Sequence, residues 1–362
     1  MSRPRYGRGT LRRDLAAAVR RLEPRPGSVL VLLDRRAAVA RRPIAAALAD
    51  AGLPARWISW SASERRKTLA ALERLGRAAV RAGVDRRSLL LAAGGGVTTD
   101  LGGFLAATLL RGIRWGAIPT TLLGLVDAAL GGKTAVDLPE GKNLLGAFHP
   151  PQFVIGDLAL LRTLPAREWS CGLGEVLKSA LIAGEPLLRR LERTPPADLR
   201  RPGAATLRIA QDCADLKMEV VEQDPRESGL RKVLNLGHSF GHALEAAAGY
   251  RRLAHGEAVA LGILCALRFG EDAGLLERAF STRVRGLARR LGLPAAFPGR
   301  LPATTDLRRL LQRDKKARSG NLELLIPVRA GEILLLECVA PAAAAAAIRR
   351  ELGATPTPDA SA

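Results

Sequence analysis

The sequence predicts an α/β protein whose N-terminal domain contains a parallel sheet and whose C-terminal domain is mainly helical. In the first half, short apolar runs typical of buried strands alternate with helical segments, and this order favours a Rossmann-like parallel sheet with crossover helices. From about residue 157 onwards, helical patterns dominate. We therefore expect domains at residues 1–156 and 157–352, followed by a disordered tail at residues 353–362.

Three strands are expected in the first half, and each one precedes a helix. The signal for a strand is a short apolar run bounded by a polar residue or a glycine-rich turn. Such runs predict strands at residues 28–33, 55–60 and 88–93. Helices are predicted at residues 41–51 and 64–82, each closed by a glycine, and after Gly94-Gly95-Gly96.

Helices should fill most of the second half, because apolar residues recur there at helical spacing. They are predicted at residues 167–183, 204–222, 233–248, 255–273, 275–291, 305–313 and 342–352. Residues 321–327 and 332–338 flank a glycine-containing turn and are predicted to form a small antiparallel hairpin.

The composition fits a globular enzyme of the cytoplasm. The 362 residues are 48% hydrophobic and 25% charged. The sequence has no long uncharged apolar run, and no apolar signal region follows its basic start, so we expect neither a membrane span nor export. The four cysteines are far apart and form no Cys-x-x-Cys pair, which favours reduced thiols.

The net charge of +21 raises the alternative of a nucleic-acid-binding protein. However, the basic residues are interleaved with alanine and leucine, and aromatic residues make up only 4% of the chain, which is few for stacking on single strands. We therefore expect no nucleic acid and no membrane as a partner. Arginines number 48 and lysines only 8, so a lysine suggests a site that needs a compact point charge.

Three of the four histidines lie in one short stretch, between residues 238 and 255. His238 and His242 are four residues apart and would project from one face of a helix, while His255 begins the next apolar segment and could fold back towards them. Converging neutral imidazoles are typical ligands of a divalent transition metal. They could instead be surface or helix-packing residues, but their clustering favours a metal or catalytic site.

Glu175 and Lys178 lie three residues apart in the segment Gly-Leu-Gly-Glu-Val-Leu-Lys and would share one face of a helix. They could form an ordinary surface salt bridge. Alternatively, Glu175 would join the histidines and supply the carboxylate of a site with two histidines and one glutamate. That combination is typical of a catalytic metal site with an open position.

A further group of motifs is rich in glycine and begins directly after the third predicted strand. Gly94-Gly95-Gly96-Val97-Thr98-Thr99-Asp100 joins that strand to a helix, so its backbone could approach a phosphate closely, although it could also be a plain tight turn. Residues 118–122, 126–134 and 141–146 combine glycine with lysine, threonine or asparagine. These loops fit the binding of an oxyanion or a polyol.

Taken in order, these motifs resemble 3-dehydroquinate synthase, a family of the sugar phosphate cyclases. The resemblance covers residues 29–339 and rests on GGGVTTD, IPTTLL, VDAALGGKT, GKNLLGAF, GLGEVLK, ESGLRKVLNLGHSFGHALEA, HGEAVALG and RDKK. It implies a dehydroquinate synthase-like fold. It also implies an NAD- and metal-dependent lyase of the shikimate pathway, which leads to the aromatic amino acids.

The resemblance implies that a divalent metal, Zn²⁺ or Co²⁺, is bound by Glu175, His238 and His255. His242 then becomes an active-site group and not a ligand, which corrects the pairing suggested by spacing alone. The resemblance also implies a site for NAD. Its residues would be Asp34, Glu64, Lys67, Gly95, Gly96, Val97, Asp100, Thr120, Thr121, Lys133 and Lys142.

The implied substrate is a seven-carbon sugar phosphate, 3-deoxy-D-arabino-heptulosonate 7-phosphate (DAHP). Its hydroxyl and carboxylate groups would meet Asp127, Lys178, Lys217, Glu227 and Arg231. Its phosphate would meet Lys133, Asn143, Asn235, His242 and one of Lys315 or Lys316. The family further implies a homodimer, in which Arg111 would reach the site of the partner subunit.

The implied reaction converts DAHP into 3-dehydroquinate and phosphate. It combines transient oxidation by NAD, phosphate elimination, re-reduction and an intramolecular aldol closure, and the substrate's own phosphate can serve as the base. Two other enzymes remain as alternatives: a related cyclase such as aminodehydroquinate synthase, and a metal-dependent polyol dehydrogenase. The dehydrogenase would accumulate NADH and would not need the predicted cluster of phosphate-binding cations.

Overall fold

The computed structural model describes residues 3–312 and 321–353 and divides into two compact units. The first unit comprises residues 1–169 and 197–226, and the second comprises residues 170–196 and 227–362. The first contains a parallel sheet and the second is mainly helical, which confirms the predicted fold class. The domain boundary expected after residue 156 stays a prediction. The tail expected at residues 353–362 lies, apart from its first residue, outside the described residues.

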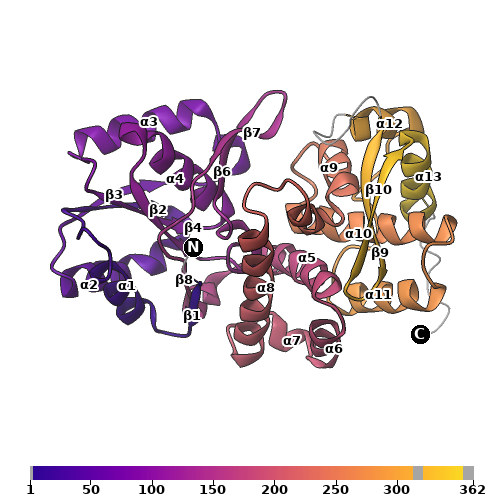
Figure 1. Ribbon diagram of the computed structural model, residues 1–362, viewed down its shortest axis with the longest axis horizontal. Coiled ribbons are helices and arrows are strands. Elements are labelled where there is room, and N and C mark those ends of the chain that lie inside the picture. The colour runs from indigo at the N-terminus through magenta and orange to yellow at the C-terminus, as the bar shows by residue number, and fades with distance from the viewer. Residues whose placement is uncertain (1–2, 313–320, 354–362) are drawn as a thin grey trace. The chain divides into compact units, whose positions relative to one another are not determined.

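A four-stranded parallel sheet forms the centre of the first unit (Figure 1). Its strands are β2 (Val29–Asp34), β3 (Ala55–Trp60), β4 (Leu89–Gly94) and β5 (Arg114–Pro119), in the order β3-β2-β4-β5. The central strands β2 and β4 are buried along their whole length, as expected for strands covered on both faces. The three predicted strands are confirmed. β5 is an additional strand, and its outer side forms a parallel bridge between Ala117 and Val154.

Helices cover both faces of this sheet. Figure 1 shows α3 (Leu69–Arg81) and α4 (Gly96–Thr108) on one face, and α1 (Leu11–Arg20) and α2 (Arg41–Asp50) on the other. This arrangement is the one that crossover connections between parallel strands produce.

The start predicted for the helix at residues 64–82 is wrong, because α3 begins at Leu69. A short helical turn ends at Arg66, and α3 begins only after Thr68, whose side chain caps the new helix by accepting a hydrogen bond from Ala71 N (3.2 Å). From there Leu75 joins the core cluster formed with the central strands.

The first unit also contains elements that the sequence analysis does not predict. β1 (Arg5–Gly7) pairs in parallel with β8 (Ile155–Asp157), and β6 (Lys133–Leu138) forms an antiparallel hairpin with β7 (Gly141–Phe148). The predicted helix at residues 204–222 is confirmed as α8 (Ala204–Gln223) and belongs to this unit. Short helical segments of the chain are η1 (Arg35–Ala40), η2 (Glu64–Arg66), η3 (Leu109–Arg111), η4 (Gly124–Ala128), η5 (Leu158–Thr163), η6 (Leu230–Asn235) and α7 (Pro196–Leu199).

The second unit consists of helices around one hairpin. Its helices are α5 (Ala166–Ala183, whose first turn belongs to the first unit), α6 (Glu185–Arg193), α9 (His238–Ala247), α10 (His255–Asp272), α11 (Arg278–Arg290), α12 (Thr304–Gln312) and α13 (Pro341–Leu352). β9 (Leu322–Arg329) pairs antiparallel with β10 (Glu332–Val339), which confirms the predicted hairpin. α10 is mostly buried and contacts α9, α11, α13 and β9, so it is the central helix of this unit.

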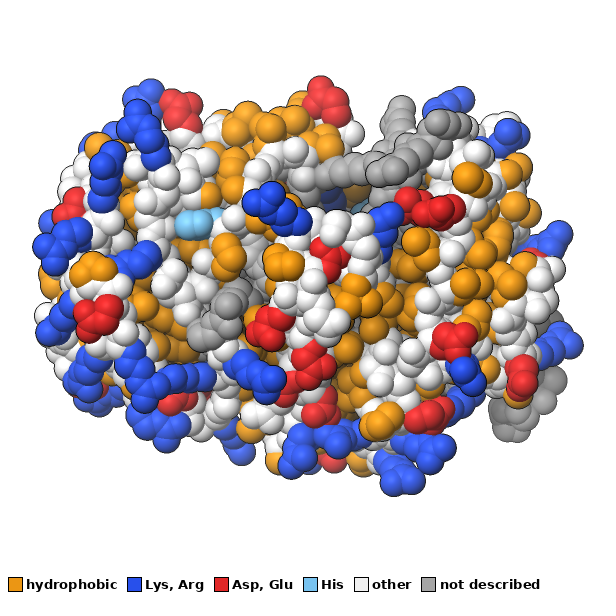
Figure 2. Space-filling model, viewed as in Figure 1, with side chains coloured by type: hydrophobic (Ala, Val, Ile, Leu, Met, Phe, Trp, Pro, Cys, Tyr) orange, Lys and Arg blue, Asp and Glu red, His pale blue; other side chains and the backbone are white. Residues whose placement is uncertain are grey.

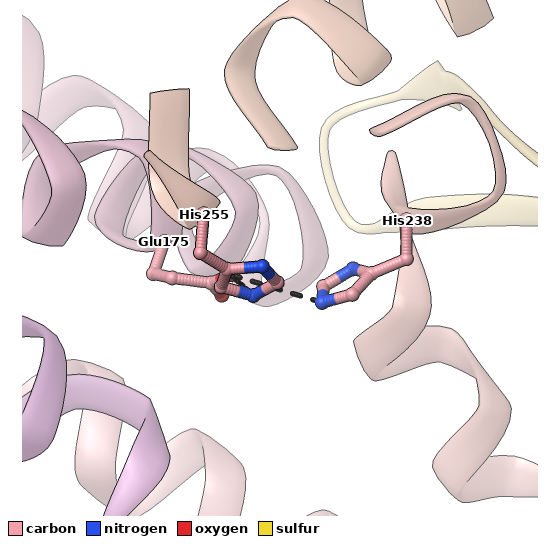
Figure 3. A group of neighbouring side chains, drawn as sticks. All are labelled: Glu175, His238 and His255. Atoms are coloured by element: carbon pink, nitrogen blue, oxygen red, sulfur yellow. Dashed lines mark ion pairs between the residues drawn. The ribbon is translucent and has the colours of Figure 1, made fainter. Parts of the chain in front are cut away.

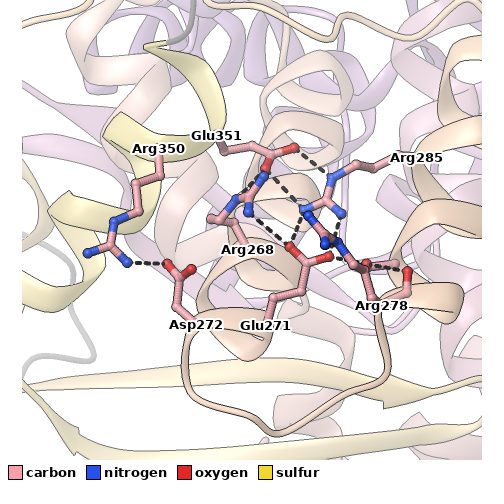
Figure 4. A network of polar contacts seen from close by, with 8 residues as sticks. Arg268, Glu271, Asp272, Arg278, Arg285, Arg350 and Glu351 are labelled. Atoms are coloured by element: carbon pink, nitrogen blue, oxygen red, sulfur yellow. Dashed lines mark hydrogen bonds and ion pairs between the residues drawn. The ribbon is translucent and has the colours of Figure 1, made fainter.

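Salt bridges connect α10, α11 and α13 (Figure 4). The guanidinium of Arg285 on α11 lies 2.8 Å from the carboxylate of Glu271 on α10 and 2.9 Å from that of Glu351 on α13. Arg268 contacts the same two carboxylates, at 3.2 and 3.1 Å. This network stabilises the far end of the helix that begins at His255.

Basic side chains are scattered over the face shown in Figure 2, with acidic side chains among them. The excess of +21 is therefore not gathered into one patch on that face. Within residues 3–312 and 321–353, no helix combines the length and the apolar character that crossing a bilayer requires.

Candidate functional site

The three predicted metal ligands lie together on three helices of the second unit (Figure 3). Glu175 is in the middle of α5, His238 is the first residue of α9 and His255 is the first residue of α10. One nitrogen of each imidazole and one carboxylate oxygen all lie within 4.8 Å of one another. Side chains that are far apart in the sequence therefore converge on one point.

Glycines allow α5 and α10 to approach closely at this point. A Cβ atom at Gly174 would collide with the carbonyl oxygen of Gly256, and a Cβ atom at Gly256 would collide with that of Cys171. The N–H of Gly256 also donates a hydrogen bond to Cys171 Sγ (3.2 Å). Because Gly174 precedes Glu175 and Gly256 follows His255, this backbone contact brings the carboxylate beside the imidazole.

Two further glycines bring α9 against α10. Gly237 has φ +79°, a backbone conformation that favours glycine, and it ends the preceding turn. For this reason α9 begins at His238. The predicted start at residue 233 is wrong. A Cβ atom at Gly262 would collide with the carbonyl oxygen of Gly237. This close packing brings the ring centroids of His238 and His255 to 5.2 Å.

The carboxylate of Glu175 is completely buried. Its Oε2 atom forms an ion pair with Lys178, one turn later on the same helix, so the predicted pair is a buried contact and not a surface salt bridge. Neither oxygen accepts a hydrogen bond of normal geometry from the part of the chain that the structure describes. An ionised carboxylate that is buried without such hydrogen bonds costs free energy unless cations neutralise it. The site is therefore electrostatically suited to a divalent metal.

Both imidazoles direct their Nε2 atoms towards Glu175. His238 Nε2 lies 3.8 Å and His255 Nε2 lies 3.4 Å from Glu175 Oε1. The Nδ1 atoms have acceptors of their own: Leu236 O lies 3.3 Å from that of His238, and Glu245 Oε2 lies 3.3 Å from that of His255. Since these acceptors hold a proton on Nδ1, the Nε2 atoms are the ones directed to the shared point, as metal ligation requires.

In the metal-free protein, the two carboxylates also hold a second proton on His255. Burial lowers the pKa of this imidazole, but Glu245 and Glu175 outweigh burial and raise the pKa to about 10. A histidine must be neutral to bind a metal, so an incoming cation would displace the proton and take over the neutralisation of Glu175. Two imidazoles and one carboxylate then leave coordination positions for oxygen atoms of a substrate.

His242 occupies a different position from the other two histidines. It follows His238 by one turn of α9, and the two ring centroids are 5.4 Å apart, but the residue is exposed. His242 is not part of the group of converging ligand atoms. The helical pair suggested by spacing alone is therefore not the set that the structure brings together.

Glu245 is a candidate functional residue that the sequence analysis misses. It is 1% exposed and its carboxylate contacts His255 Nδ1. A carboxylate behind a metal-binding histidine orients the ring and makes the imidazole a stronger ligand. One signal was available in the sequence, because Glu245 is the single acidic residue of α9, seven residues after His238.

Several residues predicted to bind substrate also lie in the second unit. Arg231 and Lys178 are buried, at 1% and 2% exposed. Arg231 and Asn235 belong to η6, directly before α9, and Asn235 Nδ2 donates a hydrogen bond to Glu227 Oε1 (2.5 Å). The predicted phosphate ligands Lys315 and Lys316 lie outside the described residues.

In the first unit, predicted dinucleotide residues lie at the carboxyl ends of two neighbouring strands. Gly95 and Gly96 follow β4 and begin α4, while Thr120 and Thr121 follow β5. The two loops are in contact: Thr120 N donates a hydrogen bond to Gly94 O (2.9 Å), and a Cβ atom at Gly95 would lie 3.1 Å from Thr121 Cγ2. A helix N-terminus beside strand ends is suited to a dinucleotide pyrophosphate.

Three more predicted dinucleotide residues lie on other elements of this unit. Asp34 is the last residue of β2 and is buried, and its Oδ1 accepts a hydrogen bond from Arg36 N (3.1 Å). Val97 lies in the first turn of α4. Lys133, predicted for both the dinucleotide and the phosphate, is exposed at the start of β6.

Several other predicted residues of this unit form ion pairs. Lys67 Nζ lies 2.5 Å from Asp100 Oδ2 and also donates to Asn143 Oδ1. Lys142 Nζ lies 3.3 Å from Glu64 Oε1. A further pair joins the predicted substrate residues Asp127 and Lys217, with Nζ 2.7 Å from Oδ1.

Comparison with known proteins identifies relatives along most of the chain. Residues 57–171 match the family model described as 3-dehydroquinate synthase N-terminal, and residues 172–317 match the one described as 3-dehydroquinate synthase C-terminal. A 3-dehydroquinate synthase of Symbiobacterium thermophilum is 42% identical over 340 residues, which cover 93% of this chain and 94% of that protein.

Solved structures share the fold. A 2-epi-5-epi-valiolone synthase from Streptomyces hygroscopicus, with NAD⁺ and Zn²⁺ bound, has a TM-score of 0.85 and 29% identity over 97% of this chain and 96% of its own. A 2-deoxy-scyllo-inosose synthase, complexed with carbaglucose-6-phosphate, NAD⁺ and Co²⁺, has a TM-score of 0.83 and 25% identity over 96% of each chain.

Metal binding should release a proton at neutral pH. Because the pKa of His255 is about 10 in the metal-free protein, this imidazole is protonated below that pH and must lose the proton to become a ligand. The affinity for Zn²⁺ should therefore increase by about tenfold per pH unit until the pH reaches that pKa. Isothermal titration calorimetry in buffers of different ionisation enthalpy measures the released proton. A binding enthalpy that is the same in all buffers would contradict this assignment.

Replacing Glu245 with glutamine should weaken the metal site without removing a ligand. Glutamine can still accept the hydrogen bond from His255 Nδ1 but carries no charge, so Glu245→Gln should lower the affinity for Co²⁺ by about 10- to 100-fold. Titration of the visible absorption of bound Co²⁺ measures this affinity.

A matched control for this variant is Glu257→Gln. Glu257 lies two residues after His255 but accepts a hydrogen bond from the backbone of Ala254 (2.8 Å). Its replacement should change the affinity for Co²⁺ by about twofold at most, because glutamine can still accept the hydrogen bond of the helix cap. Equal losses of affinity in both variants would show a general effect on α10 and contradict the role of Glu245.

Proposed function

Since the chain belongs to the 3-dehydroquinate synthase family, we propose that it converts DAHP into 3-dehydroquinate and inorganic phosphate. The convergence of Glu175, His238 and His255 is the observation that supports this proposal most strongly, because these side chains offer the donor atoms of a catalytic metal site. The reaction eliminates phosphate and closes a carbocycle, so the enzyme is a carbon–oxygen lyase.

Two cofactors are proposed, a divalent metal and NAD. When bound, Zn²⁺ or Co²⁺ would supply Lewis acidity to a substrate hydroxyl, and NAD would supply the reversible uptake of one hydride. Glu175, His238 and His255 would hold the metal, and Glu245 would keep the ring of His255 in position. The two solved relatives that bind NAD⁺ together with Zn²⁺ or Co²⁺ support this combination.

The proposed NAD site is the edge of the sheet where β4 and β5 end. Gly95 and Gly96 lack side chains, so the backbone at the start of α4 can approach a pyrophosphate and donate N–H groups to it. Thr120 and Thr121 would contact the same part of the dinucleotide. The other residues proposed for NAD are Asp34, Glu64, Lys67, Val97, Asp100, Lys133 and Lys142.

Buried cations are proposed to bind the anionic substrate. The planar guanidinium of Arg231 can hold a carboxylate through two hydrogen bonds, whereas the ammonium of Lys178 offers a compact charge beside Glu175. Asp127, Lys217 and Glu227 are proposed for the substrate hydroxyls. The residues proposed for the phosphate are Lys133, Asn143, Asn235, His242 and one of Lys315 or Lys316.

This arrangement assigns the protein the task of orientation and charge stabilisation. Cations around the phosphate would hold it and stabilise the charge that develops as its bond to carbon breaks. A strong protein base is not required, because a phosphate oxygen of the substrate can accept the proton. Relatives of 42% identity that are 3-dehydroquinate synthases favour this reaction over an amino analogue or a polyol dehydrogenase.

We also propose that the enzyme is a homodimer of the cytoplasm. An apolar groove of about 550 Å³ lies between α3 and α4, and Leu69, Leu105 and Leu109 contribute to its lining. The next two residues, Leu110 and Arg111, have φ values of 53° and 68°, which are costly for residues other than glycine and are usually retained for a function. A second copy packed on this groove would accept Arg111 into its phosphate site.

An assay of the purified protein with metal, NAD and DAHP tests the proposed reaction. Phosphate should be released in proportion to the substrate consumed, while absorbance at the NADH band returns to its starting value, because the hydride is given back. Glu175→Gln should lose nearly all of this activity, since it removes one metal ligand. Lasting NADH without phosphate release would contradict the proposal and support a polyol dehydrogenase.

Mixing two inactive variants tests the proposed sharing of Arg111. Arg111→Ala and Glu175→Gln should each be nearly inactive alone. After subunit exchange, half of the dimers would be mixed, and each mixed dimer would contain one intact site, so about a quarter of the wild-type activity should return. If the mixture stays inactive although mass spectrometry detects mixed dimers, Arg111 serves its own subunit and this proposal is wrong.

A further inference from the structure

Two loops of the first unit are tied together by backbone and side-chain contacts. The first loop, residues 61–68, joins β3 to α3, and the second, residues 137–143, contains the tip of the β6–β7 hairpin. The N–H of Asp137 donates a hydrogen bond to the carbonyl oxygen of Lys67 (2.7 Å), and Asp137 also forms a parallel bridge with Thr68. We call this set of contacts the loop clasp.

The side chain of Lys67 lies at the centre of the loop clasp. Lys67 is only 2% exposed, and its Nζ contacts Asp100 Oδ2 (2.5 Å) and donates to Asn143 Oδ1. Burial lowers the pKa of this ammonium, but Asp100 and Glu64 outweigh burial and raise the pKa above its ordinary value, so Lys67 keeps its charge. Glu64 in turn pairs with Lys142 (3.3 Å), which adds an ion pair between the two loops.

Asn143 is held from two sides. Its φ of +54° is uncommon for a residue other than glycine, and such a conformation persists only where the surroundings fix it. Its N–H donates to Asp137 Oδ1 (2.8 Å), while its side-chain oxygen accepts from Lys67. Because Oδ1 accepts from the ammonium of Lys67, the amide is held in one orientation, in which Nδ2 is its donor group.

From this geometry we propose that Lys67 is a positioning residue for the substrate, in addition to its expected place in the NAD site. It orients the amide of Asn143 so that Nδ2 can donate to an oxygen of the substrate phosphate. Through Asp100 the same ammonium is tied to the helix that begins at Gly95 and Gly96, so it links the dinucleotide loop to the substrate loop. This inference rests on the proposed function, because that function assigns the phosphate to Asn143.

A double-mutant cycle on Lys67 and Asn143 tests the proposal. KM for DAHP is measured at saturating NAD for Lys67→Met, Asn143→Ala and the double variant. Each single change should raise KM by about 10- to 100-fold, the range for one hydrogen bond with a charged partner. Because Lys67 acts through Asn143, the KM of the double variant should be no higher than the higher KM of the two single variants. Effects that multiply, or an unchanged KM in Lys67→Met, would overturn the proposal.

Two further variants keep this test decisive. Arg12→Met removes an exposed ion pair with Asp50 (2.7 Å) in the same unit and should leave KM unchanged. If Lys67→Met fails to fold, Asp137→Ala releases the N–H of Asn143 instead and should raise KM without adding to the effect of Asn143→Ala. If the two effects multiply, the positioning role is wrong.

The failure of this inference can be distinguished from a failure of the proposed function. If the wild-type protein releases no phosphate from DAHP, the proposed function fails, and the loop clasp is tested separately by hydrogen exchange of residues 137–143. Lys67→Met should lose protection there, and unchanged protection would contradict the clasp. If the wild-type protein is active but the increases in KM of the two single variants multiply in the double variant, only the inference fails.

Discussion

The buried carboxylate of Glu175 is the constraint on which the second unit depends. An ionised carboxylate in the protein interior costs several kcal/mol unless nearby cations offset that cost. The structure pairs Oε2 with Lys178 on the same helix, whereas Oε1 lies near the Nε2 atoms of His238 and His255. This convergence is possible because glycines let α5 and α9 approach α10 at backbone distance. The candidate metal site thus depends on helix packing as much as on ligand chemistry.

The use of lysine in an arginine-rich chain follows the same electrostatic logic. The side chains of Lys67 and Lys178 are 3% and 2% exposed, and each is paired with a carboxylate. Many arginine pairs, by contrast, lie on the surface, as in the contact of Arg77 with Glu73, where the side chains are 69% and 66% exposed. A compact ammonium fits a confined space in which a planar guanidinium would require more room. Lys67 and Lys178 are therefore placed where space is confined, although the buried Arg231 shows that this preference is not general.

The sequence predicts the central fold well, because β4 and all of β2 except Asp34 are free of polar side chains. In the long helices, apolar residues recur at helical spacing. It misses β5, whose apolar run contains Gly116 and Pro119, and the β6–β7 hairpin, in which β7 is largely exposed, because neither has the sequence pattern of a buried strand. The histidine cluster predicts a metal site, but helical spacing alone selects His242, since spacing shows which residues share a face and not which helix that face meets. Glu245 is missed because its one signal in the sequence, a single carboxylate on α9, does not distinguish it from a surface residue.

X-ray absorption spectroscopy of the Zn²⁺-loaded protein tests the central claim most directly, because it reports the atoms bound to the ion without reference to turnover. The account predicts two imidazole nitrogens at about 2.0–2.1 Å together with oxygen ligands, and no sulfur. This pattern should lose imidazole scattering when His255 or His238 is replaced by alanine. A sulfur ligand at about 2.3 Å, or a shell of oxygen atoms without imidazole, would contradict the assignment of Glu175, His238 and His255 as the metal site.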